Sequence, residues 1–290
     1  INLTGTLKNP SSKQLDMHID LEELNMNKSS ISGLLDIKDL STPDIQFALK
    51  GLVDFSDVKG LIVQDESDEL SGKTLFNVEG KLPYNDTLDQ LNFSASTVQG
   101  DIELRDVNYN GADGSLAKQL FAKCRIKGDV LNQVEIKGEL WKNNVDFVGT
   151  IGNWQTYLVN QKRLKINGTL KSTQVNLDFS GDTTENVDTT KLTSLNYDID
   201  TDLKLEVENF VWSNFKAKNL TGRLLWNNRG ILFRNLIFDA WGGTNQMDGE
   251  LLEFEEEFAL SSTSISENVA IEELLKDFDN FGQSEFTPEI

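Results

Sequence analysis

The 290-residue chain contains 27 Lys and Arg residues against 47 Asp and Glu residues, which gives a formal net charge of −20 at pH 7. A surface of this sign repels phosphate groups, so we expect no nucleic-acid partner and no docking on anionic lipid headgroups. Apolar residues make up 38% of the chain and charged residues 26%. This composition excludes a disordered chain and fits one large β domain or two moderate ones.

A short unit recurs from the start of the chain, in which a glycine has an apolar residue two positions before it and two positions after it. Because side chains alternate along a strand, the glycine and both apolar residues share one strand face. Glycine weakens a strand unless it permits a bend or the close approach of another backbone, so the repeat favours a curved sheet. The alternative is that each glycine ends a strand and starts a turn. The central glycines are Gly5, Gly33, Gly51, Gly60, Gly80, Gly100, Gly128, Gly138, Gly149, Gly168, Gly222 and Gly249.

Apolar and polar residues alternate between these units, for example over residues 203–207, and turn signals such as Asn110-Gly111 separate the runs. The pattern predicts an all-β fold with a long curved antiparallel meander, built as an open groove or as a β-sandwich or solenoid-like sheet. Apolar residues at helical spacing predict a short C-terminal helix over residues 267–280. A weaker helical pattern covers residues 115–123.

The composition changes after residue 182, where a stretch rich in Thr, Asn and Asp contains few apolar residues. We therefore predict a repetitive β region over residues 1–182, a linker or long loop over residues 183–196, and a second β module over residues 197–290. Both ends of the chain look cut, because a strand-like pattern begins at Ile1 and the chain stops shortly after the predicted helix. Any membrane anchor is expected to lie outside this chain.

Catalytic and metal-binding patterns are missing from the sequence. The single histidine, His18, lies in an alternating strand without a supporting nucleophile motif, and the single cysteine, Cys124, permits no internal disulfide. Gly72-Lys73-Thr74 resembles the end of a phosphate-binding loop, but Ser67 occupies the position of its first glycine and a strand pattern follows. We predict no enzyme activity, no metal site and no cofactor.

Aromatic residues concentrate between residues 210 and 241, where they offer either an ordinary packed core or an apolar surface for a hydrocarbon ligand. Alternation places Leu224 and Trp226 on one face of a strand. It places Leu232, Leu236 and Phe238 together on one face of the next strand. These five side chains are the predicted lipid-binding residues.

The stretch from Leu220-Thr221-Gly222 to Trp241-Gly242-Gly243, followed by Met247-Asp248-Gly249, resembles the carboxy-terminal module of AsmA-like proteins. The segment over residues 271–283 resembles the helix that follows in members from Bacteroidetes-type bacteria. The resemblance is specific over residues 203–283 and architectural over residues 1–182. The family's next strand would begin after Pro288, so the chain is shorter than the family pattern.

This resemblance implies a periplasmic protein of the bacterial envelope, anchored to the inner membrane by a segment absent from this chain. It also implies a role in lipid transport or outer-membrane homeostasis, with phospholipid as the partner of an apolar β groove. A structural or adhesin-like interaction module without lipid is the alternative, and a carbohydrate-active enzyme is a weaker third hypothesis. Two carboxyl groups facing each other across a cleft would favour the enzyme.

Overall fold

The computed structural model describes residues 2–11, 14–62, 68–85, 90–111, 116–159, 162–177, 198–254 and 257–277. Most of their strands form an open meander in which chain order is also strand order, from β1 to β18, while β6 and β7 form a separate two-stranded sheet and β13 pairs with β14 outside this order. All pairings from β1 to β10 and from β14 to β18 are antiparallel. The predicted all-β meander is therefore confirmed. The predicted linker at residues 183–196 lies outside the described residues.

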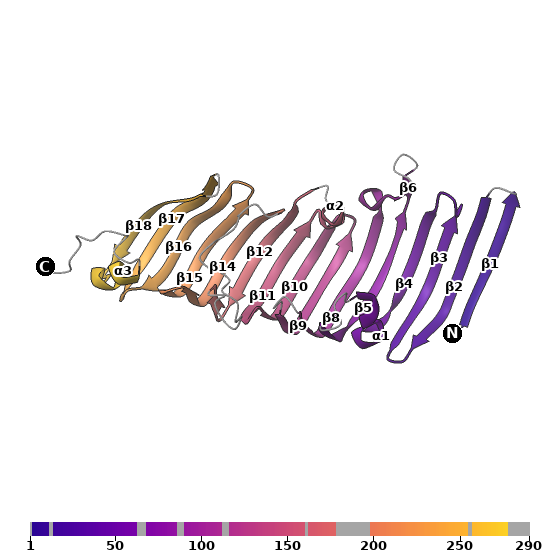
Figure 1. Cartoon of the computed structure of the whole chain (residues 1–290), viewed down its shortest axis with the longest axis horizontal. Coiled ribbons are helices and arrows are strands. Elements are labelled where there is room, and N and C mark those ends of the chain that lie inside the picture. Colours follow the sequence, from indigo (N-terminus) through magenta and orange to yellow (C-terminus); the bar gives the residue numbers. More distant parts are fainter. Residues whose placement is uncertain are drawn as a thin grey trace. The chain divides into compact units, whose positions relative to one another are not determined.

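The chain divides into two compact units, of residues 1–141 with 148–165 and of residues 142–147 with 166–290. The strands of the first, called unit 1, include β1 (Asn2–Ser11), β2 (Gln14–Met26), β3 (Ser29–Lys38), β4 (Asp44–Asp54), β5 (Glu69–Leu82), β8 (Thr97–Asn110), β9 (Leu116–Lys127) and β10 (Val130–Leu140). Its smaller elements are α1 (Phe55–Ile62), β6 (Tyr84–Asn85), β7 (Gln90–Leu91), the single-turn helix η1 (Phe93–Ala95) and α2 (Trp154–Leu158). Figure 1 shows these strands side by side, with both helices at strand ends.

The second unit, called unit 2, contains β13 (Val175–Asn176), β14 (Ile199–Trp212), β15 (Phe215–Asn227), β16 (Gly230–Ala240), β17 (Gly243–Phe254), β18 (Glu257–Glu267) and α3 (Ile271–Asp277). The division falls within β11 (Asn143–Gly152) and β12 (Leu164–Ser172). The short strand β13 runs parallel to β14, which is a local exception to the antiparallel pattern.

Ten of the twelve repeated glycines lie inside strands, as predicted, and two do not. Gly60 lies in α1, because Asp54 caps this helix: its Oδ1 accepts hydrogen bonds from the Ser56 amide at 3.0 Å and the Ser56 hydroxyl at 2.6 Å. Gly128 lies in the turn between β9 and β10 with a φ of +57°. The turn interpretation is therefore correct at Gly128, and the helix at Gly60 was not predicted.

The weak helical pattern over residues 115–123 is wrong, because residues 116–127 form strand β9, paired on both sides. The C-terminal helix is confirmed over the shorter range of α3. Pairing of β18 with β17 continues to Glu267, and Asn268 then turns the chain with a φ of +58°. Residues 278–280 of the predicted helix lie outside the described residues.

Candidate functional site

Unit 1 carries an apolar face that runs across the strands from β2 to β10. Residues paired in register share a face, so the register gives the rows that cross the sheet. The three central rows, called the unit 1 apolar face, are Ile19, Leu35, Phe47, Gly80 and Val98; Leu21, Gly33, Leu49, Val78, Gly100, Ile126 and Leu131; and Leu24, Ile31, Gly51, Phe76, Ile102 and Cys124.

The opposite face of the same strands is polar. One row there consists of Asp20, Leu34, Ala48, Glu79, Gln99 and Lys127. Ion pairs also lie on this side, with Nζ of Lys81 at 2.9 Å from Oδ2 of the half-buried Asp44 and Nε of the exposed Arg125 at 2.9 Å from Asp101 Oδ1. Exposed pairs of this kind contribute little stability, and their main effect is to keep this face hydrated.

Among the described elements of unit 1, no second layer packs over the apolar face. Apart from contacts between neighbouring strands, α1 contacts β4 and β5, and α2 contacts η1. Most side chains of the face are therefore only half-buried, whereas Ile126 is 4% exposed. A continuous apolar surface of this kind on a folded protein marks a binding site for an apolar partner.

Cys124 provides a chemical probe at this position. Its register partner is Ile102, so it lies within the apolar face, and burial raises the pKa of its thiol. The neighbouring Arg125 belongs to the polar face. A thiol at residue 124 and a thiol at residue 125 would therefore report on opposite faces of the same strand.

At one end of strands β8 to β10, a set of hydrogen bonds joins α2 to Asp129 and Ser96. We call this set the α2 lock. Asp129, in the β9–β10 turn, accepts hydrogen bonds from the backbone amides of Gln155 at 2.7 Å and Thr156 at 3.2 Å. It also accepts one from the Thr156 hydroxyl at 2.8 Å. The buried Gln155 side chain donates to the Ser96 hydroxyl at 2.6 Å. The carboxylate thus caps the amino-terminal end of α2 from a neighbouring hairpin.

We expect Asp129→Ala to release α2 and to lower the stability of this end of unit 1 by about 0.5–2 kcal/mol, the usual effect of removing a cap. Hydrogen exchange at residues 154–158 should accelerate while exchange in β4 stays unchanged. Asp101→Ala is the control, since this side chain makes an exposed ion pair with Arg125 and takes no part in the hydrogen bonds to α2. Equal exchange in both variants would show that the lock does not hold α2.

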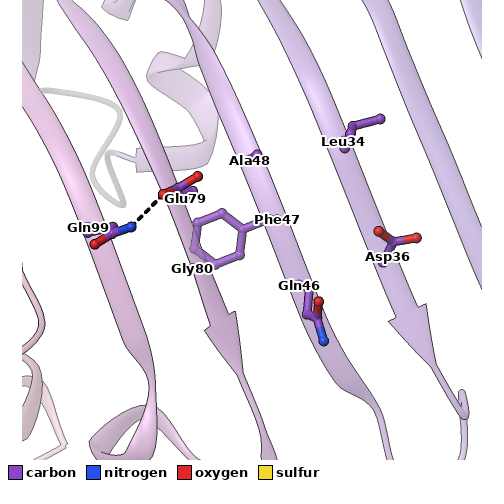
Figure 2. Close-up of a pocket in the computed structure, with 8 residues that line it drawn as sticks. All are labelled: Leu34, Asp36, Gln46, Phe47, Ala48, Glu79, Gly80 and Gln99. Carbon is purple, nitrogen blue, oxygen red and sulfur yellow. Dashed lines mark hydrogen bonds between the residues drawn. The ribbon is translucent and has the colours of Figure 1, made fainter.

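A shallow depression of about 300 Å³ lies on strands β3, β4, β5 and β8 of unit 1. Most of its lining belongs to the polar face, and Figure 2 shows Gln99 bonded to Glu79 through Nε2 and Oε1 at 2.5 Å. The Phe47 ring lies beside Gly80, where a β-carbon would lie 2.4 Å from the Thr97 carbonyl oxygen. The depression is open, and its two carboxyl groups, Asp36 and Glu79, belong to β3 and β5, the strands on either side of β4.

A cluster of buried hydrophobic side chains packs in unit 2 and includes two of the predicted lipid-binding residues. Leu236 is 5% and Phe238 is 4% exposed, and both belong to this core. The Phe215 ring contacts Phe238, with centroids 5.7 Å apart, and Trp241, with centroids 5.3 Å apart. Trp241 also donates from Nε1 to Asp277 Oδ2 at 2.9 Å, which ties α3 to the sheet. The packed-core interpretation of the aromatic cluster therefore applies to Leu236 and Phe238.

The remaining three predicted residues lie on two different faces. Leu224 and Trp226 are half-buried and pair with Phe233 and Ile231, on the core side. The prediction that Leu232 shares a face with Leu236 and Phe238 is wrong.

A bulge explains this error. The register of β16 with β17 shifts between Phe233 and Leu236, where Asn235 has a φ of +49°. The extra residue inverts the alternation, so Leu232 pairs with Leu225 and Glu250 on the face of the unit 2 sheet opposite its core. Gly222 accommodates the bulge, because a β-carbon at this glycine would lie 2.8 Å from the Asn235 carbonyl oxygen.

His18 is exposed on β2, where its Nδ1 contacts the Asp36 carboxylate, and no nucleophile accompanies the pair. The described part of the chain contains no group of three or more His, Cys, Asp or Glu side chains placed to hold a metal ion. No helix within the described ranges has the length and apolar character required to cross a bilayer.

Comparison of the chain with protein-family models, with curated proteins and with solved structures finds no significant match. These comparisons therefore contribute nothing to a functional assignment. The unit 1 apolar face is the candidate site, and the sequence indicated it only indirectly, through the repeated glycine units.

Proposed function

We propose that this protein handles lipids, holding acyl chains against the unit 1 apolar face. Two observations together support this proposal. Unit 1 has a continuous apolar surface, and no described element covers it. Lipid chains require apolar contact and no specific chemistry, and the described residues present no catalytic constellation that would point to another role. The resemblance of residues 203–283 to AsmA-like proteins supports the same function and a periplasmic setting in a bacterial envelope.

The dimensions of the face fit this proposal. Seven strands lie between β2 and β10 inclusive, and neighbouring strands are about 4.8 Å apart, so the face extends on the order of 30 Å across the strands. The hydrocarbon core of a bilayer is about 30 Å thick, or about 15 Å for the chains of one leaflet. A phospholipid acyl chain could therefore lie entirely within the face.

The direct test compares maleimide labelling of Cys124 before and after incubation with phospholipid vesicles, alongside native mass spectrometry of the purified protein. We expect lipid to slow the labelling of Cys124 at least several-fold, because an acyl chain covers the thiol. The matched control carries Cys124→Ser with Arg125→Cys, which moves the thiol to the polar face, and its labelling rate should not change. Equal rates with and without lipid at Cys124, together with a lipid-free mass, would instead favour the structural or interaction module.

A further inference from the structure

The shallow depression of unit 1 is a concavity on the polar face that the proposed lipid function does not use. Residues of β3, β4, β5 and β8 line it, and its volume is about 300 Å³. The small Ala48 side chain leaves space above β4, and its register partner Leu34, at 42% exposed, adds an apolar surface beside it. The polar part of the lining consists of the amide and carboxyl groups of Gln46, Gln99, Asp36 and Glu79. A concave surface that joins apolar and polar groups in this way fits a small ligand or a side chain of a partner.

The two carboxyl groups of the depression have no lysine or arginine partner among the described residues. Glu79 accepts a hydrogen bond from the Gln99 amide at 2.5 Å, and Asp36 contacts Nδ1 of His18. Within the ranges that the structure describes, no Lys or Arg forms an ion pair with either carboxylate. Both carboxylates therefore keep the capacity to pair with an ammonium group.

Other carboxylates on the same face of the sheet do have such partners. Asp101 pairs with Arg125 at 2.9 Å, and Glu103 contacts the guanidinium of Arg105. The depression thus differs from its surroundings in the charge that is left without compensation. In a chain with a net charge of −20, this local excess favours a cationic ligand and disfavours an anionic one.

The register places the two carboxyl groups at diagonal positions on either side of β4. Asp36 pairs with Gln46, and Glu79 pairs with Ala48, two residues further along the same strand. The α-carbons of Asp36 and Glu79 are therefore about 10 Å apart across the strands and about 7 Å apart along them. An alkyl chain with an ammonium group at each end could lie over Ala48 and reach both carboxylates.

We propose that the depression binds an organic dication, with two ammonium groups on an alkyl spacer and one group at each of Asp36 and Glu79. A free diamine and two lysine side chains of a partner protein both supply this chemistry. The side-chain oxygens of Gln46 and Gln99 accept further hydrogen bonds from the ammonium groups, and Leu34 contacts the spacer. This site lies on the polar face of unit 1 and does not depend on the proposed lipid function.

The test is a titration of the whole isotope-labelled chain with 1,6-diaminohexane, followed through its amide NMR signals. We expect saturable shifts that are largest at residues 34–36, 46–48 and 79–80. The shorter 1,3-diaminopropane cannot reach both carboxylates, so it should bind at least fivefold more weakly. A short peptide with lysines two positions apart distinguishes the two sources. Tighter binding of this peptide would identify a partner protein, and tighter binding of 1,6-diaminohexane would identify a free diamine.

Glu79→Gln removes one of the two charges without changing the size of the side chain, and it should weaken binding of 1,6-diaminohexane at least fivefold. Asp36→Asn removes the other charge from a different strand and should have the same effect, which keeps the proposal testable if one variant fails to fold. The matched control is Glu103→Gln, which changes the net charge equally on the same face but outside the depression. Equal weakening by Glu103→Gln, or shifts spread evenly over the polar face, would show only general attraction to an acidic chain and would overturn the site.

Discussion

Replacing Gly100 with valine is expected to destabilise unit 1 by several kcal/mol, because both the space and the backbone conformation at this position exclude a side chain. A β-carbon at this position would lie 2.1 Å from the Asn77 carbonyl oxygen and 2.7 Å from the Val78 α-carbon. The backbone φ of +142° is also one that residues with a side chain rarely adopt. Backbone strain contributes about 1–3 kcal/mol and overpacking another 1–3 kcal/mol. Together they remove a large part of the 5–15 kcal/mol that is typical of a domain.

Two other glycines with the same local sequence pattern are the controls. Gly128→Asn should change the stability by about 1 kcal/mol or less, since space is free around this turn residue and asparagine tolerates its left-handed backbone. Gly60→Ala should raise the stability of α1 by up to about 1 kcal/mol, because alanine favours a helix and nothing lies within 4 Å of its β-carbon.

Urea unfolding followed by circular dichroism, with hydrogen exchange in β5, β8 and β9, measures all three variants. The expected order of stability is Gly60→Ala, then Gly128→Asn, then Gly100→Val. If Gly100→Val were as stable as Gly128→Asn, the backbones of β5 and β8 would not lie close together at Gly100.

Local patterns in the sequence predict the strands well and the exceptions poorly. Alternation and the glycine units indicate β3, β4, β5 and β8 correctly, because side chains along a strand point to the two faces of the sheet in turn, with a period of two. The segment around Gly60 has the same pattern but forms α1, whose Asp57 accepts hydrogen bonds from the Lys28 amide at 2.9 Å and the Ser29 hydroxyl at 2.6 Å. These contacts join residues that lie 28 and 29 positions apart in the sequence, so no local window contains them.

The candidate site was only partly predictable for the same physical reason. The sequence indicates which side chains alternate, but one extra residue in a strand exchanges its two faces. Asn235 is such a residue, and although asparagine tolerates the left-handed backbone, its residue type alone does not place a bulge at this position. Whether an apolar face is covered depends on packing between layers, and this is why Phe238 is buried in a core while Phe47 remains half-buried on the unit 1 apolar face.

Leu49→Lys is expected to abolish lipid binding while the adjacent Ala48→Lys leaves it unchanged. Leu49 lies in the central row of the unit 1 apolar face, between its register partners Gly33 and Val78. Ala48 lies on the polar face and pairs with Glu79, which can accept the new ammonium group. Both variants add one positive charge at almost the same place in the chain. Any difference between them must therefore come from the face that receives the charge.

A lysine on the apolar face would either hold its ammonium group against acyl chains or displace them. An uncompensated charge in an apolar contact costs several kcal/mol, and each 1.4 kcal/mol weakens binding about tenfold, so the loss should exceed tenfold. Binding of a pyrene-labelled phospholipid measures it, and hydrogen exchange in β3 to β5 checks that both variants keep their sheet. If both lysines reduced binding equally, the effect would be one of net charge. Equal retention of lipid by both variants would place the acyl chains elsewhere, because a half-buried leucine at the centre of the face could not be replaced by a charge without loss of contact.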